Sequence, residues 1–335
     1  MLKKIAVFFL IMVLFAGFVS CTKVKPQKIE EGMRGSTGGQ VQNNDSIERK
    51  PVAMEPPKSF IDSSKFHMPA DKIYYTKRAV VLTYHHISLK PFSGITIRPE
   101  RFEADLKMLK NNYFNVISLR DLINSMGGKD KMPPNAVVIT FDDGYESFYK
   151  YAYPLLKKYN FPAASFVITS WVDKYSHSTD ELSILSSNEI REMYKSGLID
   201  IQSHSDGGHY YIKTKEGKER GALAYQIYDG NKLESEGTYR KRVSGDLSRS
   251  ISLIKSFTGN TSDILCFPFG HYNQRLVEIA QGVGFKYFVT TVSGYNSEGS
   301  KSIYIRRIRS GDRSLNPDKL KADIISCGRG RSLKK

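Results

Sequence analysis

Short apolar runs alternate with helix-like periods along most of this chain. The apolar runs have the length of buried strands and are rich in Val, Ile and Phe. They predict strands at residues 79–84, 115–119, 136–141, 163–168, 198–203, 263–269 and 286–291. The segments between them place apolar residues at helical spacing, which predicts helices within residues 99–113, 146–159, 187–197, 243–257 and 273–284.

The order of these elements predicts an α/β fold. Strands separated by helices need crossover connections, so we expect a mainly parallel sheet. About seven such units fit a closed barrel better than a doubly wound open sheet. Ser118 and Asp121 have the spacing of a helix-capping pair. Residues 210–242 break the repeat: this polar, tyrosine-rich segment is longer than an ordinary connection, so we expect it to be functional or mobile.

The N-terminal segment differs from the rest. Lys3 and Lys4 precede an apolar run from Ile5 to Val19, which is too short to span a bilayer and predicts a secretory signal. The sequence "GFVSC" resembles the lipobox of bacterial lipoproteins, in which the cysteine, here Cys21, is lipidated. We therefore expect an exported, membrane-anchored lipoprotein of the bacterial cell envelope, with plain secretion as the alternative.

Composition sets the predicted domain limits. Residues 22–59 contain no aromatic residue and are rich in Gly, Gln, Asn and Pro, so residues 1–21 are interpreted as a lipoprotein signal peptide and 22–72 as a disordered tether. A folded domain is predicted at 73–326, followed by a basic tail at 327–335. Of the three cysteines, Cys266 and Cys327 are expected to form no structural disulfide.

The chain of 335 residues carries a formal charge of +16. An exported protein meets anionic wall polymers, lipopolysaccharide or lipid headgroups, so we expect no nucleic-acid partner. A merely solvated basic surface explains the charge equally well.

Polar clusters follow four of the predicted strands. "YHH" follows residues 79–83, "DDG" follows 136–141, "HSDGGH" follows 198–203, and "FPFG" ends the strand predicted at 263–269. The carboxyl ends of parallel strands meet at one face, where the following loops converge. The four clusters are therefore predicted to form one site.

Two imidazoles and one carboxylate are a common donor set for a catalytic divalent cation. His204 and His209 would be about 140° apart on a helix, so they can share an ion only from a loop, which the two glycines between them favour. Asp143 supplies the carboxylate. Zn²⁺ fits this set, and Co²⁺, Ni²⁺ or Fe²⁺ would also bind it. Asp142 is then placed to take a proton from water acidified by the cation.

These motifs resemble those of the carbohydrate esterase family 4 polysaccharide deacetylases. The resemblance rests on "TFDDG", on the His204–Ser205 pair followed by His209, and on "FPFG" with Pro268, and it covers roughly residues 79–314. It implies a NodB homology domain, a distorted (β/α)7 barrel, with a polar insertion after the second metal histidine. The histidine spacing and "YHHI" at 84–87 are similar to the branch that de-N-acetylates poly-β-1,6-N-acetylglucosamine in biofilms.

The resemblance also implies a role for each site residue. Asp142 is the base, and Asp143, His204 and His209 are the metal ligands. The branch places the general acid on His85, and the family uses the backbone N–H at Phe269 to stabilise the oxyanion. The sequence departs from the family pattern at one motif position. Cys266 replaces the arginine of the third family motif, and we hypothesise that Arg307 takes its place. Trp171 and Tyr210 are candidates for stacking on sugar rings.

We therefore expect a metal-dependent, monomeric enzyme that removes N-acetyl groups from a β-linked N-acetylglucosamine polysaccharide and releases acetate. Its expected partners are this acetylated polymer and, through the lipid anchor, a membrane. Peptidoglycan N-deacetylation and glycan O-acetyl ester hydrolysis are the alternatives within the enzyme class. A non-catalytic glycan-binding lipoprotein is the alternative outside it, although the presence of the base and all three ligands argues against it.

Overall fold

A largely parallel sheet organises the residues that this computed structural model describes, which are 59–61, 68–176 and 182–332. Its ten strands have the order β12-β1-β5-β6-β7-β10-β11-β13, with β14 paired to β1 and β4 paired to β5. Their bounds are β1 (Arg78–Tyr84), β4 (Asn115–Val116), β5 (Ala136–Phe141), β6 (Ala163–Ile168), β7 (Ile199–Ser205), β10 (Ile264–Cys266), β11 (Tyr287–Val289), β12 (Asn296–Ser297), β13 (Tyr304–Ile305) and β14 (Ile308–Arg309).

The sheet is a nearly closed barrel, which confirms the fold class predicted from the sequence. β13 pairs with β11 at one end of the sheet, and only two residues separate it from β14, which pairs with β1 near the other end. The end of the chain therefore brings the last strands back to the first. Two small sheets lie outside the barrel sheet: β2 (His86–Ile87) with β3 (Thr96–Ile97), and β8 (Tyr211–Lys213) with β9 (Glu219–Gly221).

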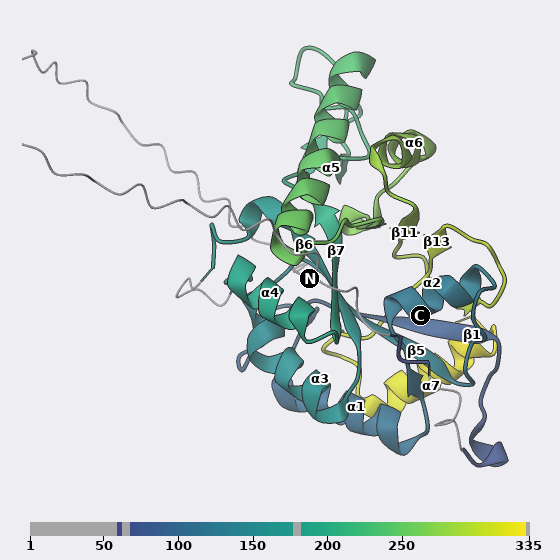
Figure 1. Cartoon of the computed structure of the whole chain (residues 1–335). Helices are drawn as coiled ribbons and strands as arrows, with labels where there is room; N and C mark the ends of the chain where they lie inside the picture. Colours follow the sequence, from purple (N-terminus) through teal and green to yellow (C-terminus); the bar gives the residue numbers. More distant parts are fainter. Residues whose placement is uncertain (1–58, 62–67, 177–181, 333–335) are drawn as a thin grey trace, which may run out of the picture. The chain divides into compact units, whose positions relative to one another are not determined.

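Helices surround the strands (Figure 1). Their bounds are α1 (Pro99–Asn111), α2 (Leu119–Met126), α3 (Tyr153–Tyr159), α4 (Ser187–Lys195), α5 (Glu236–Thr258), α6 (Gln274–Val283) and α7 (Pro317–Gly328), with a π-helical turn at Phe148–Ala152 before α3. The predicted capping pair is confirmed, because the Ser118 and Asp121 side chains each accept the other residue's backbone N–H at the start of α2. Within the described residues, no helix is both long and apolar enough to cross a bilayer.

Both faces of the central strands are buried, which explains their continuous apolar sequence. In β5, Val137, Ile139 and Phe141 pack in the outer core with α1, α3 and α4. The alternate side chains Ala136 and Val138 pack in a second core with residues of β1, β6, β10 and β11. This second core fills the barrel interior with side chains. The polar residues that follow the strands can therefore gather only at the barrel end.

Several predicted elements differ at their ends, and one helix was not predicted. The strand predicted to continue to residue 269 ends at Cys266, because Pro268–Gly270 forms a 3₁₀ turn. β7 extends to Ser205 and so includes one of the predicted metal histidines. The helix predicted at 243–257 begins at Glu236, inside the segment expected to be a long connection, and α7 was not predicted.

Some residues of the predicted tether contact the domain. Ser59 Oγ and the Phe60 N–H donate hydrogen bonds of 2.7 and 2.9 Å to the Asp121 carboxylate. The Asn135 amide donates to the Lys72 carbonyl at 2.8 Å. The predicted signal peptide, the lipidation site Cys21 and most of the predicted tether lie outside the described residues, as do the last three residues of the predicted basic tail.

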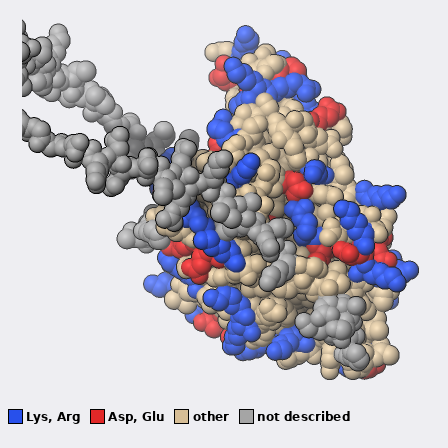
Figure 2. Space-filling view, viewed as in Figure 1, with Lys and Arg blue, Asp and Glu red and all other residues tan. Residues whose placement is uncertain are grey.

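Charged side chains are mixed on the face drawn in Figure 2, where Lys and Arg lie among Asp and Glu. Several of the basic residues are engaged in ion pairs, for example Arg120 with Asp263 at 2.8 Å and Lys158 with Glu103 at 2.8 Å. On this face the charges therefore do not gather into one basic patch.

Candidate active site

Two neighbouring carboxylates, Asp142 and Asp143, follow β5 and are both buried, with 4% and 7% of their surface exposed. Adjacent buried acids repel each other unless each finds a cation or hydrogen-bond donor. The backbone separates them, because Asp143 and Gly144 have left-handed φ values of 72° and 75°. Such strain in a residue with a side chain is characteristic of functional sites. Each acid has different partners.

Asp142 is paired with Arg307. The guanidinium donates two hydrogen bonds, from Nη1 to Oδ1 at 2.7 Å and from Nη2 to Oδ2 at 2.8 Å. Burial alone would raise the pKa of Asp142, but the guanidinium outweighs it and holds this pKa well below its ordinary value. Arg307 lies between β13 and β14, so the segment that closes the barrel delivers it to the end of β5. The structure thus places Arg307 where the sequence hypothesis required an arginine.

Asp143 lies beside both predicted metal histidines. Its Oδ1 is 3.4 Å from His204 Nε2 and 3.3 Å from His209 Nε2. Two ligand atoms that bind one ion at about 2.0–2.2 Å with near-tetrahedral angles are about 3.3–3.6 Å apart. The three side chains therefore have the donor set and the spacing of a divalent metal site.

A β-bulge orients His204. β6 and β7 pair in regular register up to Val167 and Ser203, and then Ile168 pairs with Ser205. His204 is the extra residue between these pairs, and such bulges redirect a side chain next to an active site. Its Nδ1 lies 2.8 Å from the Cys266 carbonyl, to which only a protonated nitrogen can donate, so Nε2 faces Asp143.

The proton distribution also suits a metal site. Burial and the neighbouring His204 lower the pKa of His209 to about 4, so this imidazole is neutral at physiological pH, as a ligand must be. Burial opposes a charged imidazole at His204, but the neighbouring side chains, Asp143 among them, raise its pKa. Metal ligands must be deprotonated, so a bound cation would displace any proton between His204 and Asp143.

A second trio, Asp142, His204 and Cys266, also brings three donor atoms within 4.8 Å of one another. It is the poorer site for two reasons. Both Asp142 oxygens already accept hydrogen bonds from Arg307. Burial raises the pKa of the Cys266 thiol, which receives a hydrogen bond from Arg307 at 3.2 Å and is not the thiolate that metals require.

Backbone hydrogen bonds fix the loop between the two histidines. The N–H groups of Asp206 and Gly207 donate to the Asp246 carboxylate of α5 at 3.0 and 2.8 Å. The Asp206 carboxylate accepts hydrogen bonds from Thr169 Oγ1 and from Arg249 Nε, each at 2.9 Å. These contacts hold the loop on both sides of the strand end, so His209 is positioned by packed elements even though it follows two glycines.

The remaining predicted residues surround this centre. His85 Nε2 lies 3.8 Å from Asp142 Oδ2, and its side chain is 24% exposed. Pro268 begins the 3₁₀ turn in which Phe269 has a left-handed φ of 58°. Ser205 ends β7 with its hydroxyl buried.

The predicted sugar-stacking residues lie at different distances from the centre. The Trp171 ring centroid is 6.0 Å from that of His209, whereas Tyr210 is exposed and no described ring contact links it to the site.

Sequence reasoning assigned no role to three residues of the site. Tyr211 is exposed and stacks on Phe269 with ring centroids 3.9 Å apart, and the centroids of Phe269 and His209 are 4.3 Å apart. The Cys266 thiol lies 3.7 Å from Asp142 Oδ2. Asp246 holds the histidine loop. Tyr211 lies beside Tyr210 in the unusual segment and Cys266 stands in a predicted motif, so both had a sequence signal, whereas Asp246 is defined only by tertiary contacts.

Comparison with known proteins agrees with this geometry. The polysaccharide deacetylase family matches residues 129–288. The poly-β-1,6-N-acetyl-D-glucosamine N-deacetylase of Staphylococcus aureus strain MRSA252 is 27% identical over 259 residues, which cover 73% of this chain and 83% of that protein. The structure of a de-N-acetylase from Aggregatibacter actinomycetemcomitans is 28% identical with a TM-score of 0.66, covering 73% of this chain and 99% of that one. The BpsB deacetylase domain from Bordetella bronchiseptica is 28% identical with a TM-score of 0.61, covering 72% and 98%.

Residues 129–288 therefore match the polysaccharide deacetylase domain, of the NodB homology, carbohydrate esterase family 4 class. Relatives of the chain include enzymes named as poly-β-1,6-N-acetylglucosamine N-deacetylases.

The buried pair predicts a large effect of Arg307→Met on stability. Removing one partner leaves an uncompensated charge, so we expect a loss of about 3–5 kcal/mol in the free energy of unfolding at pH 7, measured by urea titration. The loss should shrink as the pH falls. The unpaired Asp142 of the variant can take up a proton, whereas the wild-type pair loses its contribution only below about pH 4.

Two controls accompany this variant. The double variant Arg307→Met with Asp142→Asn should recover part of the loss, because no charge then remains buried. Arg309→Met, at a side chain that is 72% exposed, should change stability by about 0.5 kcal/mol or less. Equal effects of Arg307→Met and Arg309→Met would contradict the assignment.

Proposed function

We propose that this chain hydrolyses N-acetyl groups of a β-linked N-acetylglucosamine polysaccharide, such as poly-β-1,6-N-acetylglucosamine, and releases acetate. The observation that carries the proposal is the convergence of Asp143, His204 and His209 next to an Asp142 that is held by Arg307. The names of the relatives support the polymer class.

Asp143, His204 and His209 would hold a divalent cation, with Zn²⁺ as our first choice for this ligand set. When bound, the cation supplies Lewis acidity, which acidifies water and polarises the acetamide carbonyl. Metal dependence fits the family.

Asp142 is the base in this proposal. Its depressed pKa keeps it ionised at neutral pH, and Arg307 fixes the plane of the carboxylate. An Asp142 oxygen lies within 4.8 Å of a His204 ring nitrogen, so one water can contact both the base and the ion site. Asp142 accepts a proton from this water as its oxygen bonds to the acetamide carbon.

His85 and Phe269 complete the reaction. The Phe269 N–H donates to the oxygen that becomes negative in the tetrahedral intermediate. His85, whose Nε2 lies 3.8 Å from Asp142 Oδ2, donates a proton to the amine nitrogen as its bond to the acetyl carbon breaks. The products are acetate and a free glucosamine. The exposed ring of Tyr211, stacked on Phe269, and Trp171 beside His209 offer aromatic faces for sugar rings.

Asp142→Asn and Asp143→Asn separate the two acids. Asp142→Asn should retain one equivalent of metal while acetate release falls by about 10²-fold to 10⁴-fold, because only the proton acceptor is lost. Asp143→Asn should lose both metal and activity. Metal is measured by elemental analysis and acetate by coupled assay, below the unfolding temperature of each variant. A wild-type rate for Asp142→Asn would refute its assignment as base.

The substrates in this assay distinguish the alternative activities. Poly-β-1,6-N-acetylglucosamine, peptidoglycan and an O-acetylated glycan are compared, and we expect acetate from the first. Acetate from peptidoglycan alone would move the proposal to the cell wall polymer.

We also propose that Cys21 is lipidated and that the exported protein acts as a monomer at a membrane. The "GFVSC" sequence after the apolar run supports the lipid anchor. Wild-type protein expressed in bacteria should enter the detergent phase of a Triton X-114 extract, and Cys21→Ser should stay in the aqueous phase. The same distribution for both would contradict lipidation at this residue.

A further inference from the structure

The segment 210–242, which the mechanism above does not use as a whole, packs against the loop that carries His209. Gly208 lies directly before this ligand. A Cβ at Gly208 would lie 2.4 Å from Leu223 Cδ2 and 2.6 Å from Leu223 Cγ, so the Leu223 side chain covers the glycine face. Leu223 is itself 2% exposed and belongs to the core between α5 and α6. The position of Leu223 therefore limits where the His209 loop can lie.

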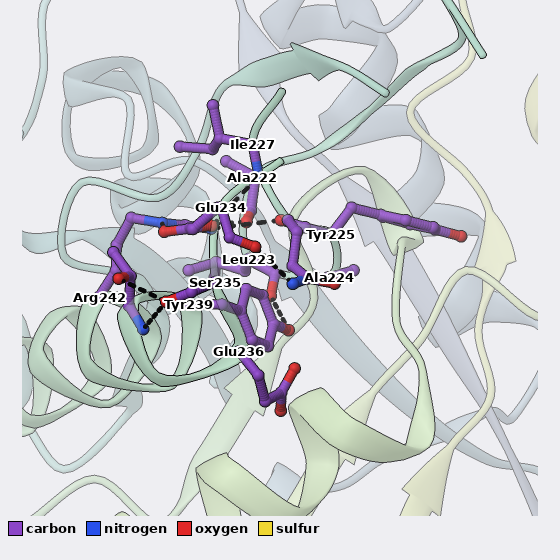
Figure 3. A network of polar contacts seen from close by, with 12 residues as sticks. Ala222, Leu223, Ala224, Tyr225, Ile227, Glu234, Ser235, Glu236, Tyr239 and Arg242 are labelled. Atoms are coloured by element: carbon purple, nitrogen blue, oxygen red, sulfur yellow. Dashed lines mark hydrogen bonds and ion pairs between the residues drawn. The ribbon is translucent and has the colours of Figure 1, made fainter. Parts of the chain in front are cut away.

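Side chains of α5, and Asn273 at the N-cap of α6, hold the backbone on both sides of Leu223. Tyr239 Oη donates to the Leu223 carbonyl at 2.7 Å, and Asn273 Nδ2 donates to the Ala224 carbonyl. Arg242 donates from Nη1 to the Ala222 carbonyl at 3.0 Å and from Nη2 to the Tyr225 carbonyl at 3.2 Å. Figure 3 shows Arg242 and Tyr239 pointing toward this turn.

Glu234 fixes Arg242. Its two carboxylate oxygens accept hydrogen bonds from Arg242 Nε and Nη2, each at 2.8 Å, and its side chain is only 7% exposed. The Ile227 N–H donates to the same carboxylate at 3.1 Å (Figure 3). The guanidinium thus has three acceptor residues, two of them backbone carbonyls, in a partly buried setting. A planar fork with five donors suits this geometry, and an ammonium does not.

The same helix also holds the loop directly. Arg242 and Asp246 are four residues apart on α5, so they lie on the same face of the helix. Asp246 accepts the N–H groups of Asp206 and Gly207, which precede Gly208 in the loop. Leu223, whose carbonyl accepts a hydrogen bond from Tyr239 of α5, contacts Gly208 in the same loop. α5 therefore determines the position of His209 through two separate routes.

We propose that segment 210–242 is a positioning element for the metal ligand His209, and that Arg242 is its principal positioning residue. The proposal rests on the proposed metal site. Arg242 touches neither the ligands nor the reacting atoms; it acts by holding Leu223 against Gly208. Partners beyond the ligands themselves commonly change metal affinity by about 10-fold to 100-fold. If the segment instead only gripped polymer, its loss would leave metal affinity unchanged.

Co²⁺ titration of the metal-free full chain tests this proposal. Arg242→Ala should raise the dissociation constant for Co²⁺ about 10-fold or more, with the stoichiometry still one per chain, as measured by calorimetry and by the visible absorption of bound Co²⁺. Circular dichroism monitors folding. An unfolded fraction would lower the stoichiometry, whereas a displaced loop weakens the binding of every molecule. Arg240→Ala is the matched control, because Arg240 pairs on the surface of the same helix with Glu236 at 2.6 Å and is 48% exposed.

A second pair of variants covers the case in which Arg242→Ala fails to fold. Leu223→Ala removes the contact with Gly208 without exposing a charge, and it should also weaken Co²⁺ binding about 10-fold. Leu276→Ala removes an equally buried leucine from the same core, on α6, and should leave the dissociation constant within about twofold.

The outcomes separate this inference from the function on which it rests. Weaker binding by Arg242→Ala and Leu223→Ala, with wild-type binding by Arg240→Ala and Leu276→Ala, supports it. Wild-type binding by all four variants, or equal weakening by Leu223→Ala and Leu276→Ala, overturns it while the metal site stands. Failure of the wild-type chain to bind Co²⁺ overturns the proposed function, and this inference with it.

Discussion

The burial of two adjacent carboxylates is the constraint on which the rest of the site depends. Asp142 and Asp143 follow a strand that is buried along its whole length, so neither acid can rely on water for its charge. The fold gives them different partners. Arg307 neutralises Asp142, whereas Asp143 has two imidazoles whose geometry suits a shared cation. This division turns a repulsive pair into a base beside an ion site.

The segments that supply these partners lie far apart in the sequence, and the barrel brings them together. The bulge between β6 and β7 points His204 at Asp143, and the segment that closes the barrel brings Arg307 to Asp142. The Cys266 carbonyl orients His204, and its thiol contacts the Asp142–Arg307 pair. Cys266, at the end of β10, thus contacts a partner of each acid, His204 and Arg307. The guanidinium that pairs with Asp142 comes from Arg307, in the segment between β13 and β14, and it also donates to the Cys266 thiol.

Much of this arrangement could be predicted from the sequence, because strand and helix periods and the polar clusters after strands are local signals. The barrel class, the capping pair at Ser118 and the clustering of the two acids with His204 and His209 agree with the structure. The bulge at His204 could not be predicted, since it depends on pairing with β6. The start of α5 at Glu236 and the contacts of Arg242 were also missed. The polar sequence of segment 210–242 does not show which of its side chains form hydrogen bonds with distant parts of the chain.

The central claim is that one cation is bound by Asp143, His204 and His209, and X-ray absorption of the full chain loaded with one equivalent of Zn²⁺ tests it most directly. The account predicts nitrogen and oxygen neighbours at about 2.0–2.2 Å with the outer-shell scattering of two imidazoles. A sulfur neighbour at about 2.3 Å would instead place the ion in the trio of Asp142, His204 and Cys266 and would contradict the account, as would the absence of bound zinc.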